Sequence, residues 1–187
     1  MITLRIARLD DRDTIDALIA CSARELSAGF YTAEQVASLL RYVFGVDTQL
    51  IRDGTYFVGQ AEDAGLVAAG GWSRRRTLYG GDVMKGAEDP LLDPRSEPAR
   101  IRAFFVHPDW ARQGLGRRVF GECLAAARAA GFRTLALVAT MPGEPLYRAL
   151  GFRLTERFEL TLPDGVRVPV ATMVRPVEVP APSGAGA

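Results

Sequence analysis

Two glycines lie between two arginines in one short turn, Ala111-Arg112-Gln113-Gly114-Leu115-Gly116-Arg117, which stands between an apolar segment and a predicted helix. Glycine has no Cβ, so its backbone can approach a ligand closely. The first N–H groups of a helix have no acceptor within the helix and point together beyond its N-terminus. The helix dipole adds only ~0.3–1 kcal/mol per charge at an exposed site. With Arg112, Arg117 and Arg118 beside it, this glycine turn is suited to binding a pyrophosphate.

Two common nucleotide-binding motifs do not fit the glycine turn. Val119 stands where the third glycine of a dinucleotide-binding fingerprint would fall, and no acidic residue ends the next predicted strand. The chain also has no Gly-Lys-Ser/Thr sequence of a P-loop. A glycine turn before a helix is a common structural connection, so the turn by itself leaves ligand binding open.

Two segments of the chain, taken together, resemble motifs of the GCN5-related N-acetyltransferases. Phe104-Phe105-Val106-His107-Pro108-Asp109-Trp110, followed by Gln113-Gly114-Leu115-Gly116, resembles their motif A. Leu146-Tyr147-Arg148-Ala149-Leu150-Gly151-Phe152 looks like their motif B. The order of the predicted elements from Met1 to Arg175 also matches, so the resemblance covers nearly the whole chain.

The resemblance implies that acetyl-CoA binds at motif A. A strand carrying Phe104, Phe105 and Val106 would splay from a parallel strand at Leu135–Thr140, and the pantetheine arm would lie between them like an inserted strand. The resemblance also implies a set of contacts along the glycine turn: backbone N–H groups of Gln113, Gly114, Gly116 and Arg117, with Leu115 between them and Arg112 as a side-chain helper. Ala111 departs from the family pattern, in which many members have Arg or Gln at this position. This departure weakens one side-chain contact but leaves the backbone groups.

By the same resemblance, Tyr147 contacts the cofactor and protonates the departing CoA thiolate. A positioned phenol can contribute roughly 10²–10⁴ in rate as a general acid, although a tyrosine here could also simply pack between helix and sheet. Glu144 is a candidate base for the amine, or the N-terminal charge of its helix. His107, the only histidine, precedes Pro108 and fits a structural turn better than a base.

The acceptor pocket is expected where one strand ends and a long loop begins. Trp72, Tyr79 and the run Arg74-Arg75-Arg76 lie there, in a region where the family commonly builds this pocket. Aromatic rings could sandwich an acceptor, and arginines could pair with an acidic one, but a charged run that leaves a strand is usually just solvated. Before Tyr147, Pro142-Gly143-Glu144-Pro145 replaces the asparagine that many relatives carry.

Periodicity and turn residues predict the elements that position these side chains. Thr32 and Gln35 form a capping-box pattern ahead of a helix, and Asp63-Ala64-Gly65 predicts a hairpin turn. The predicted strands are 2–6, 55–62, 66–75, 101–106, 134–140, 152–162 and 166–175, and the predicted helices are 10–26, 32–43, 47–52, 114–130 and 145–150. Residues 77–98 form a long loop, a type of segment that is usually functional or mobile.

These elements predict an α/β fold of the GNAT type. Its central sheet would be mixed and mostly antiparallel, with one parallel βαβ crossover and helices on both faces. The 187 residues, 48% of them hydrophobic, suit one domain over residues 1–175, and the Pro, Ala and Gly content of 176–187 predicts a disordered tail.

The resemblance implies an acetyl-CoA-dependent N-acetyltransferase that acts on an amine of a small molecule or peptide, with no metal and with a homodimer as one form. The alternative is a catalytically weak acyl-CoA-binding sensor, because Ala111 departs from the pattern and no base is evident. Acidic and basic residues number 22 and 23, which argues against nucleic acid or a membrane surface as the partner. No signal-peptide core or membrane span is evident, so a cytoplasmic protein, of a bacterium by its arginine and alanine content, is expected.

Overall fold

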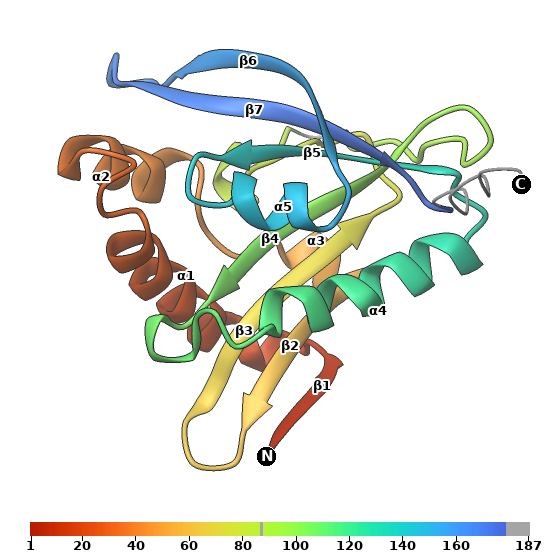
Figure 1. The fold of residues 1–187 in the computed structure, drawn as a ribbon, viewed down its shortest axis with the longest axis horizontal. Coiled ribbons are helices and arrows are strands. Elements are labelled where there is room, and N and C mark those ends of the chain that lie inside the picture. Colours follow the sequence, from red (N-terminus) through yellow and green to blue (C-terminus); the bar gives the residue numbers. More distant parts are fainter. Residues whose placement is uncertain (87, 179–187) are drawn as a thin grey trace, which may run out of the picture.

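The computed structural model describes residues 1–86 and 88–178 and is built on one seven-stranded sheet with the order β1-β2-β3-β4-β5-β7-β6 (Figure 1). In chain order the strands and helices are β1 (Ile2–Ile6), α1 (Arg12–Leu26), α2 (Ala33–Tyr42), α3 (Thr48–Arg52), β2 (Tyr56–Ala61), β3 (Gly65–Ser73), β4 (Ala99–Val106), α4 (Leu115–Ala129), β5 (Thr134–Thr140), α5 (Glu144–Ala149), β6 (Arg153–Thr161) and β7 (Arg167–Pro176). Neighbouring strands are antiparallel except β4 and β5, which α4 connects in parallel. The predicted mixed sheet with one crossover is confirmed.

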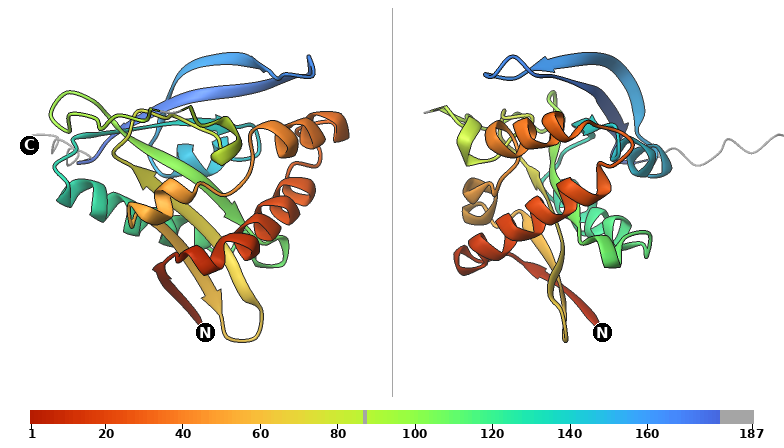
Figure 2. Two further views of the ribbon diagram at one scale, coloured as in Figure 1. Left: turned by 180° about the vertical axis from the view of Figure 1, so that it is seen from behind. Right: turned by 90° about the vertical axis from the view of Figure 1, so that its left-hand side faces the viewer.

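Helices cover both faces of the sheet, with α1, α2 and α3 on one face and α4 on the other (Figure 2). On α1, Ile15, Leu18 and Ile19 recur at helical spacing and pack against the sheet. On α4, Val119 and Cys123 do the same on the opposite face. Full burial of one large apolar side chain stabilises the fold by roughly 1.5–3 kcal/mol, so these stripes fix each helix on its face.

Local signals in the sequence act as predicted at several element ends. The capping box before α2 is present: Gln35 N donates to Thr32 Oγ1 at 3.1 Å, and Thr32 N donates to Gln35 Oε1 at 3.0 Å. Gly65 (φ +72°) ends the turn of the β2–β3 hairpin, in a left-handed conformation that glycine adopts without strain. The β6–β7 hairpin also forms as predicted, over Arg153–Thr161 and Arg167–Pro176.

β4 changes direction at a bulge in its middle. Ala103 has a φ of +54°, and the pairing of β4 with β3 shifts in register between Ala69 and Gly71. The hydroxyl of the fully buried Tyr56 donates to Ala103 O at 3.3 Å, which satisfies the carbonyl freed at the bulge. Gly70 is required opposite the bulge, because a Cβ there would lie 2.8 Å from the Phe104 ring.

Beyond the bulge β4 no longer pairs with β5. The parallel pairing covers only Ala99 with Leu135 and Arg100 with Ala136, although β4 continues to Val106 and β5 to Thr140. β5 pairs with β7 along its whole length, so the opening lies on its β4 side. The two strands therefore splay, as the resemblance implied, and leave backbone groups free along the opening.

The C-terminal end of the described structure lies slightly beyond the predicted domain boundary at 175. β7 ends at Pro176, and Val177 is buried, with its N–H bonded to Arg133 O at 2.9 Å. Residues 179–187 of the predicted tail lie outside the described residues. None of the helices that the structure describes is long and apolar enough to cross a membrane.

Candidate functional site

The glycine turn leads into α4 at Gly114, the residue that caps the helix. Gly114 has a φ of +80°, and a Cβ built there would meet no atom within 4 Å, so glycine is needed for the backbone conformation and the space beyond it is open. Arg118 N donates to Gly114 O at 3.0 Å, the first bond of the helix. The N–H groups of the residues before Arg118 therefore have no acceptor within the helix and are free for an anion.

Arg112 also has a left-handed backbone, with a φ of +64°. A non-glycine residue in this region costs roughly 1–3 kcal/mol, and such strain is concentrated at functional sites. The side chains of Arg112 and Arg117 both line the cavity described below. Two arginines and the unpaired N–H groups at the start of α4 thus lie together, and the pyrophosphate site stays a prediction.

Gly116 has a second role that the sequence did not reveal. A Cβ at Gly116 would lie 2.9 Å from Leu146 Cδ2, which is closer than real Cβ contacts. Gly116 therefore lets α5 pack directly against the first turn of α4. Because Leu146 precedes Tyr147 in α5, this contact holds motif B in place against motif A.

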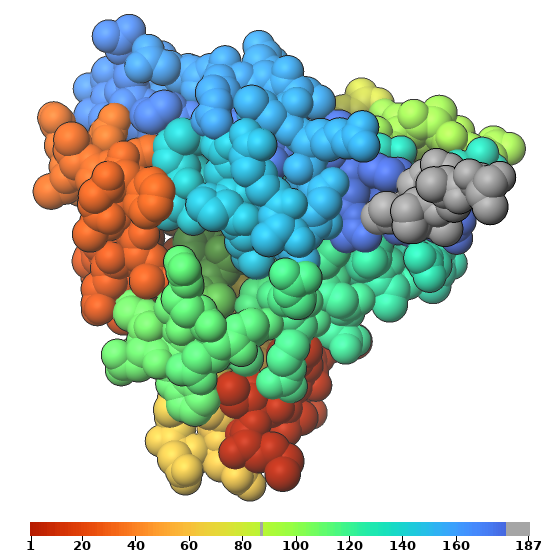
Figure 3. Space-filling model, in the orientation of Figure 1, coloured from red at the N-terminus to blue at the C-terminus, as the bar shows by residue number. Residues whose placement is uncertain are grey.

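A cavity of about 780 Å³ runs from the glycine turn to the first two helices. We divide the cavity into two halves. The β4–α4 half is lined by β4 beyond the bulge, the glycine turn and α5. The α1–α2 half is lined by α1, α2, segment 78–81, β5, β6 and β7. Figure 3 shows the hollow on the face where these segments meet. The cavity brings together most of the predicted site residues: Phe104, Phe105, Val106, Arg112, Gly114, Leu115, Gly116, Arg117, Tyr147 and Tyr79. It does not bring in Gln113, Glu144 or Trp72.

Tyr147 lies in the β4–α4 half and is 9% exposed. Its ring makes edge-to-face contacts with Phe104 and Phe152, at centroid distances of 6.1 and 5.7 Å. Burial, with a smaller contribution from Cys123, raises the pKa of Tyr147 above its ordinary value. The phenol is therefore fully protonated at neutral pH, which is the form a proton donor needs.

Glu144 is buried between two arginines instead of facing the cavity. Its Oε1 accepts hydrogen bonds from Arg157 at 2.7 Å and from Arg148 at 2.8 Å. Burial acts to raise the pKa of this carboxyl, but the hydrogen bonds from Arg157 and Arg148 outweigh it and hold the pKa below its usual range. A carboxylate so stabilised in its charged form is a weak base, so its contacts favour the structural alternative.

His107 caps the short turn after β4. Its Nδ1 accepts a hydrogen bond from Asp109 N at 3.3 Å, and its Nε2 lies 4.0 Å from Cys21 Sγ. Neither His107 nor Cys21 lines the cavity. Burial raises the pKa of the Cys21 thiol, so this cysteine is poorly suited to act as a nucleophile.

Trp72 and the arginine run point away from the cavity. Trp72 is 4% exposed and packs edge-to-face on Phe132, at 5.9 Å between centroids, in the core beneath α4. Arg75 pairs with Asp53 at 2.6 Å, and Arg76 pairs with Glu97 at 3.7 Å. Of the residues predicted for the acceptor pocket, only Tyr79 lines the cavity.

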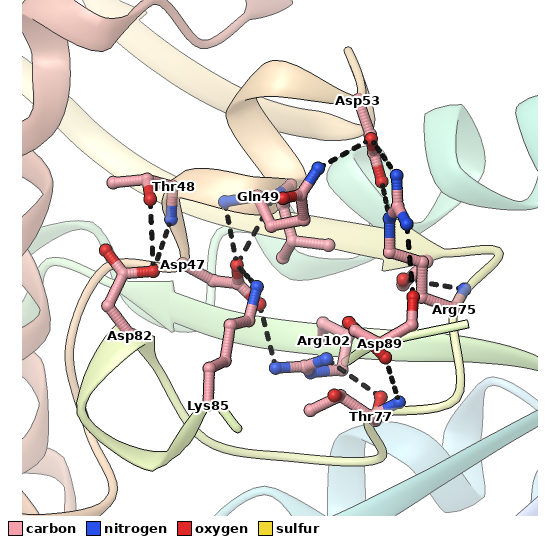
Figure 4. Close-up of polar contacts among 12 residues, drawn as sticks. Asp47, Thr48, Gln49, Asp53, Arg75, Thr77, Asp82, Lys85, Asp89 and Arg102 are labelled. Atoms are coloured by element: carbon pink, nitrogen blue, oxygen red, sulfur yellow. Dashed lines mark hydrogen bonds and ion pairs between the residues drawn. The ribbon is translucent and has the colours of Figure 1, made fainter. Parts of the chain in front are cut away.

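A buried polar network, which the sequence analysis missed, anchors the 77–98 loop (Figure 4). Arg102 of β4 is 3% exposed, donates to Asp47 Oδ2 and to Thr77 O at 2.9 Å each, and also bonds to Gly80 O. Asp47, the N-cap of α3, also pairs with Lys85. This network places segment 78–81 against the cavity. An arginine between apolar residues, Ile101 and Ala103, was the available signal, since a buried arginine needs a partner.

No metal centre is evident in the part of the chain that the structure describes. It contains no group of three or more His, Cys, Asp or Glu side chains that could hold an ion.

The splayed strand pair, the glycine turn at the start of α4 and the buried phenol of α5 thus lie together at one cavity. The sequence matches the family described as "Acetyltransferase (GNAT) domain" over residues 53–154, more than half of its 187 residues. The chain therefore belongs to the GNAT family of N-acetyltransferases. By sequence, no curated protein matches it.

Solved structures share the fold over nearly the whole chain. A GCN5-related N-acetyltransferase from Rhodopseudomonas palustris has a TM-score of 0.67 and 16% identity, over 93% of this chain and 94% of its own. YncA from Salmonella typhimurium, solved with its cofactor acetyl-CoA, has a TM-score of 0.61 and 16% identity, over 100% and 99%. The PaiA N-acetyltransferase from Thermoplasma acidophilum, in complex with coenzyme A, has a TM-score of 0.62 and 12% identity, over 94% and 99%. At these identities the likeness shows the fold alone.

Proposed function

We propose that the chain transfers an acetyl group from acetyl-CoA to an amine of a small molecule or peptide by direct attack, with both reactants bound together. The observation that carries the proposal is the position of Tyr147. This buried, protonated phenol packs on Phe104 of β4 and lines the same cavity as the glycine turn at Gly114. A proton donor, an anion site and an open strand edge thus share one cavity.

In this proposal the β4–α4 half binds acetyl-CoA. Backbone N–H groups of Gln113, Gly114, Gly116 and Arg117 hold the pyrophosphate, and the side chains of Arg112 and Arg117 add positive charge. The backbone of Phe104, Phe105 and Val106, unpaired on the β5 side, bonds to the amides of the pantetheine arm. Leu115 is 2% exposed and anchors the first turn of α4 in the core, so the N–H groups above it keep their direction.

The residues of this site are suited to one chemical step. The amine nitrogen forms a bond to the acetyl carbon while the carbon–sulfur bond breaks and its electron pair goes to sulfur. The Tyr147 hydroxyl supplies the proton that the sulfur takes up, and it regains a proton from water. The proton lost by the nitrogen goes to solvent. Holding both reactants in one cavity supplies much of the rate enhancement.

The test is Tyr147→Phe, which keeps the ring and its packing on Phe104 and Phe152 and removes the hydroxyl. We expect the turnover rate, measured by thiol release against a panel of amines, to fall by about 10²–10⁴. Acetyl-CoA affinity, measured by isothermal titration, should be unchanged. Tyr42→Phe, at a tyrosine of α2 that does not line the cavity, is the control.

Full turnover in the Tyr147→Phe variant would exclude the acid role. Acetyl-CoA binding by the wild-type protein without transfer to any amine would support an acyl-CoA-binding sensor instead.

A further inference from the structure

The α1–α2 half of the cavity is almost entirely apolar. Side chains from five parts of the chain line it: Leu26 and Phe30 at and after the end of α1, Leu39 of α2, Phe44 after α2, Leu78 of the loop and Val170 of β7. Hydroxyl groups of Ser22, Ser27 and Thr140 are among its few polar groups. A surface of this kind favours a ligand with an apolar body and offers little to a ligand that carries several charges.

The charged and titratable groups that line the whole cavity, within the described ranges, are Arg102, Arg112, Arg117, Tyr79 and Tyr147. No Asp, Glu or His among the described residues lines the cavity. The buried carboxylates among the described residues already have partners: Asp47 pairs with Arg102 and Lys85, and Glu144 pairs with two arginines. An ammonium ion in this half would thus lose water without gaining an opposite charge, and such a group binds in its neutral form.

The arginines that line the cavity are likewise not free to pair with an acceptor. Arg102 is held by Asp47 and two backbone carbonyls, and Arg112 and Arg117 belong to the glycine turn. A carboxylate on the acceptor would therefore find no free partner among the described residues of the α1–α2 half. The lack of free charged partners in this half disfavours both polyamines and free amino acids as acceptors.

We infer that the acceptor is a weakly basic primary amine on an apolar, uncharged body, such as the α-amino group of an apolar amino-acid amide. This inference rests on the proposed function and names its substrate class. An alkyl amine with a pKa of ~10.4 is neutral in about one molecule in two thousand at pH 7, whereas an α-amino group with a pKa of ~7.8 is neutral in about one in seven. No base among the described residues lines the cavity to remove the proton of the amine. The roughly 300-fold difference in neutral fraction therefore favours the weakly basic amine as the acceptor.

The experiment compares four amines on the full chain at saturating acetyl-CoA: phenylalanine amide, phenylethylamine, phenylalanine and spermidine. We expect kcat/KM for phenylalanine amide to exceed that for phenylethylamine by about 100-fold or more at pH 7. At pH 10 the excess should be less than about tenfold, because the alkyl amine is then neutral in roughly one molecule in four and the α-amino group in nearly every molecule. Phenylalanine and spermidine should react at least about tenfold more slowly than the amide at pH 7.

A carboxylate placed in the wall should hold the amine in its charged, unreactive form. Phe30 is 53% exposed at the rim, so Phe30→Asp is compatible with folding, and pairing with the ammonium should lower kcat and KM for phenylethylamine together by up to about tenfold at pH 7. Leu9, also 53% exposed but outside the cavity, gives the matched control Leu9→Asp, which should leave both constants unchanged.

Two failures are distinguishable. Preference for spermidine or free phenylalanine, a ratio between the amide and phenylethylamine that does not change with pH, or an unchanged KM for phenylethylamine in Phe30→Asp would overturn the inference and leave the acetyl transfer intact. Acetyl-CoA binding without transfer to any of the four amines, or no acetyl-CoA binding at all, would overturn the inference together with the proposed function.

Discussion

The two halves of the cavity differ in what their walls are made of. The β4–α4 half depends on backbone geometry: a bulge at Ala103, a strand pair that opens after Arg100, and a left-handed glycine at 114. The α1–α2 half depends on side chains from segments far apart in the chain, held by the network of Arg102, Asp47 and Lys85.

This difference separates the shared part of the reaction from the variable part. A backbone site tolerates substitution at most side chains around it, because the N–H groups remain whatever the side chain is. A side-chain wall changes its chemistry with every substitution. The fold can therefore keep acetyl-CoA as donor in the first half while the second half is adapted to one acceptor.

Arg102→Met tests the side-chain half most severely. The variant leaves Asp47 buried with Lys85 as its remaining ionic partner and removes the donor from Thr77 O and Gly80 O. Breaking a buried pair in this way costs about 3 kcal/mol of the free energy of unfolding, measured by urea denaturation. Segment 78–81 should lose its position, so KM for the amine should rise more than the Kd for acetyl-CoA.

Arg75→Met is the matched control, because Arg75 pairs with Asp53 but is 26% exposed. The loss there should be about 1 kcal/mol or less, as for a partly solvated pair. Equal losses in the two variants, or an equal effect on amine and acetyl-CoA, would contradict the assignment of Arg102 to the α1–α2 half.

Gly114→Trp tests the backbone half. Tryptophan would be strained at a φ of +80°, and its ring would enter the open space before the N–H groups. We expect the Kd for acetyl-CoA, measured by isothermal titration, to rise at least about 100-fold, equivalent to ~2.7 kcal/mol. Gly121→Trp, on an exposed position of α4 with no neighbour within 4 Å, should leave the Kd unchanged. Normal affinity in Gly114→Trp would remove the glycine turn from the acetyl-CoA site.

The same division explains how much could be predicted from the sequence. Signals that act within a few residues, such as the Thr32–Gln35 capping box and the glycine at 114, correctly predicted element ends and the turn before α4. The motif order predicted the splayed strands. These features depend on local backbone conformation, which a short stretch of sequence specifies.

The acceptor side could not be predicted in this way. β3 is buried on both faces from Leu66 to Ser73, so no alternation in its sequence shows that Trp72 faces the core beneath α4. Arg102 signals a buried partner, but the partner Asp47 lies 55 residues away in the chain. Contacts of that kind are set by the tertiary packing of distant segments, which one sequence does not specify.

Glu144→Gln gives the smallest expected effect and tests whether Glu144 belongs to the structure or to the chemistry. Because Arg157 and Arg148 hold its pKa below the usual value, the charged carboxylate stabilises the fold above the unfolded pKa, and this stabilisation is lost as the pH falls through the lower folded pKa. The variant should lose about 1 kcal/mol at pH 7, since both arginines are about half exposed, and the difference from wild type should vanish in acid. The turnover rate at neutral pH should change by less than about threefold, because a carboxylate with a lowered pKa is a weak base. If turnover instead fell by about two orders of magnitude while stability stayed unchanged, Glu144 would belong to the proton transfer from the amine.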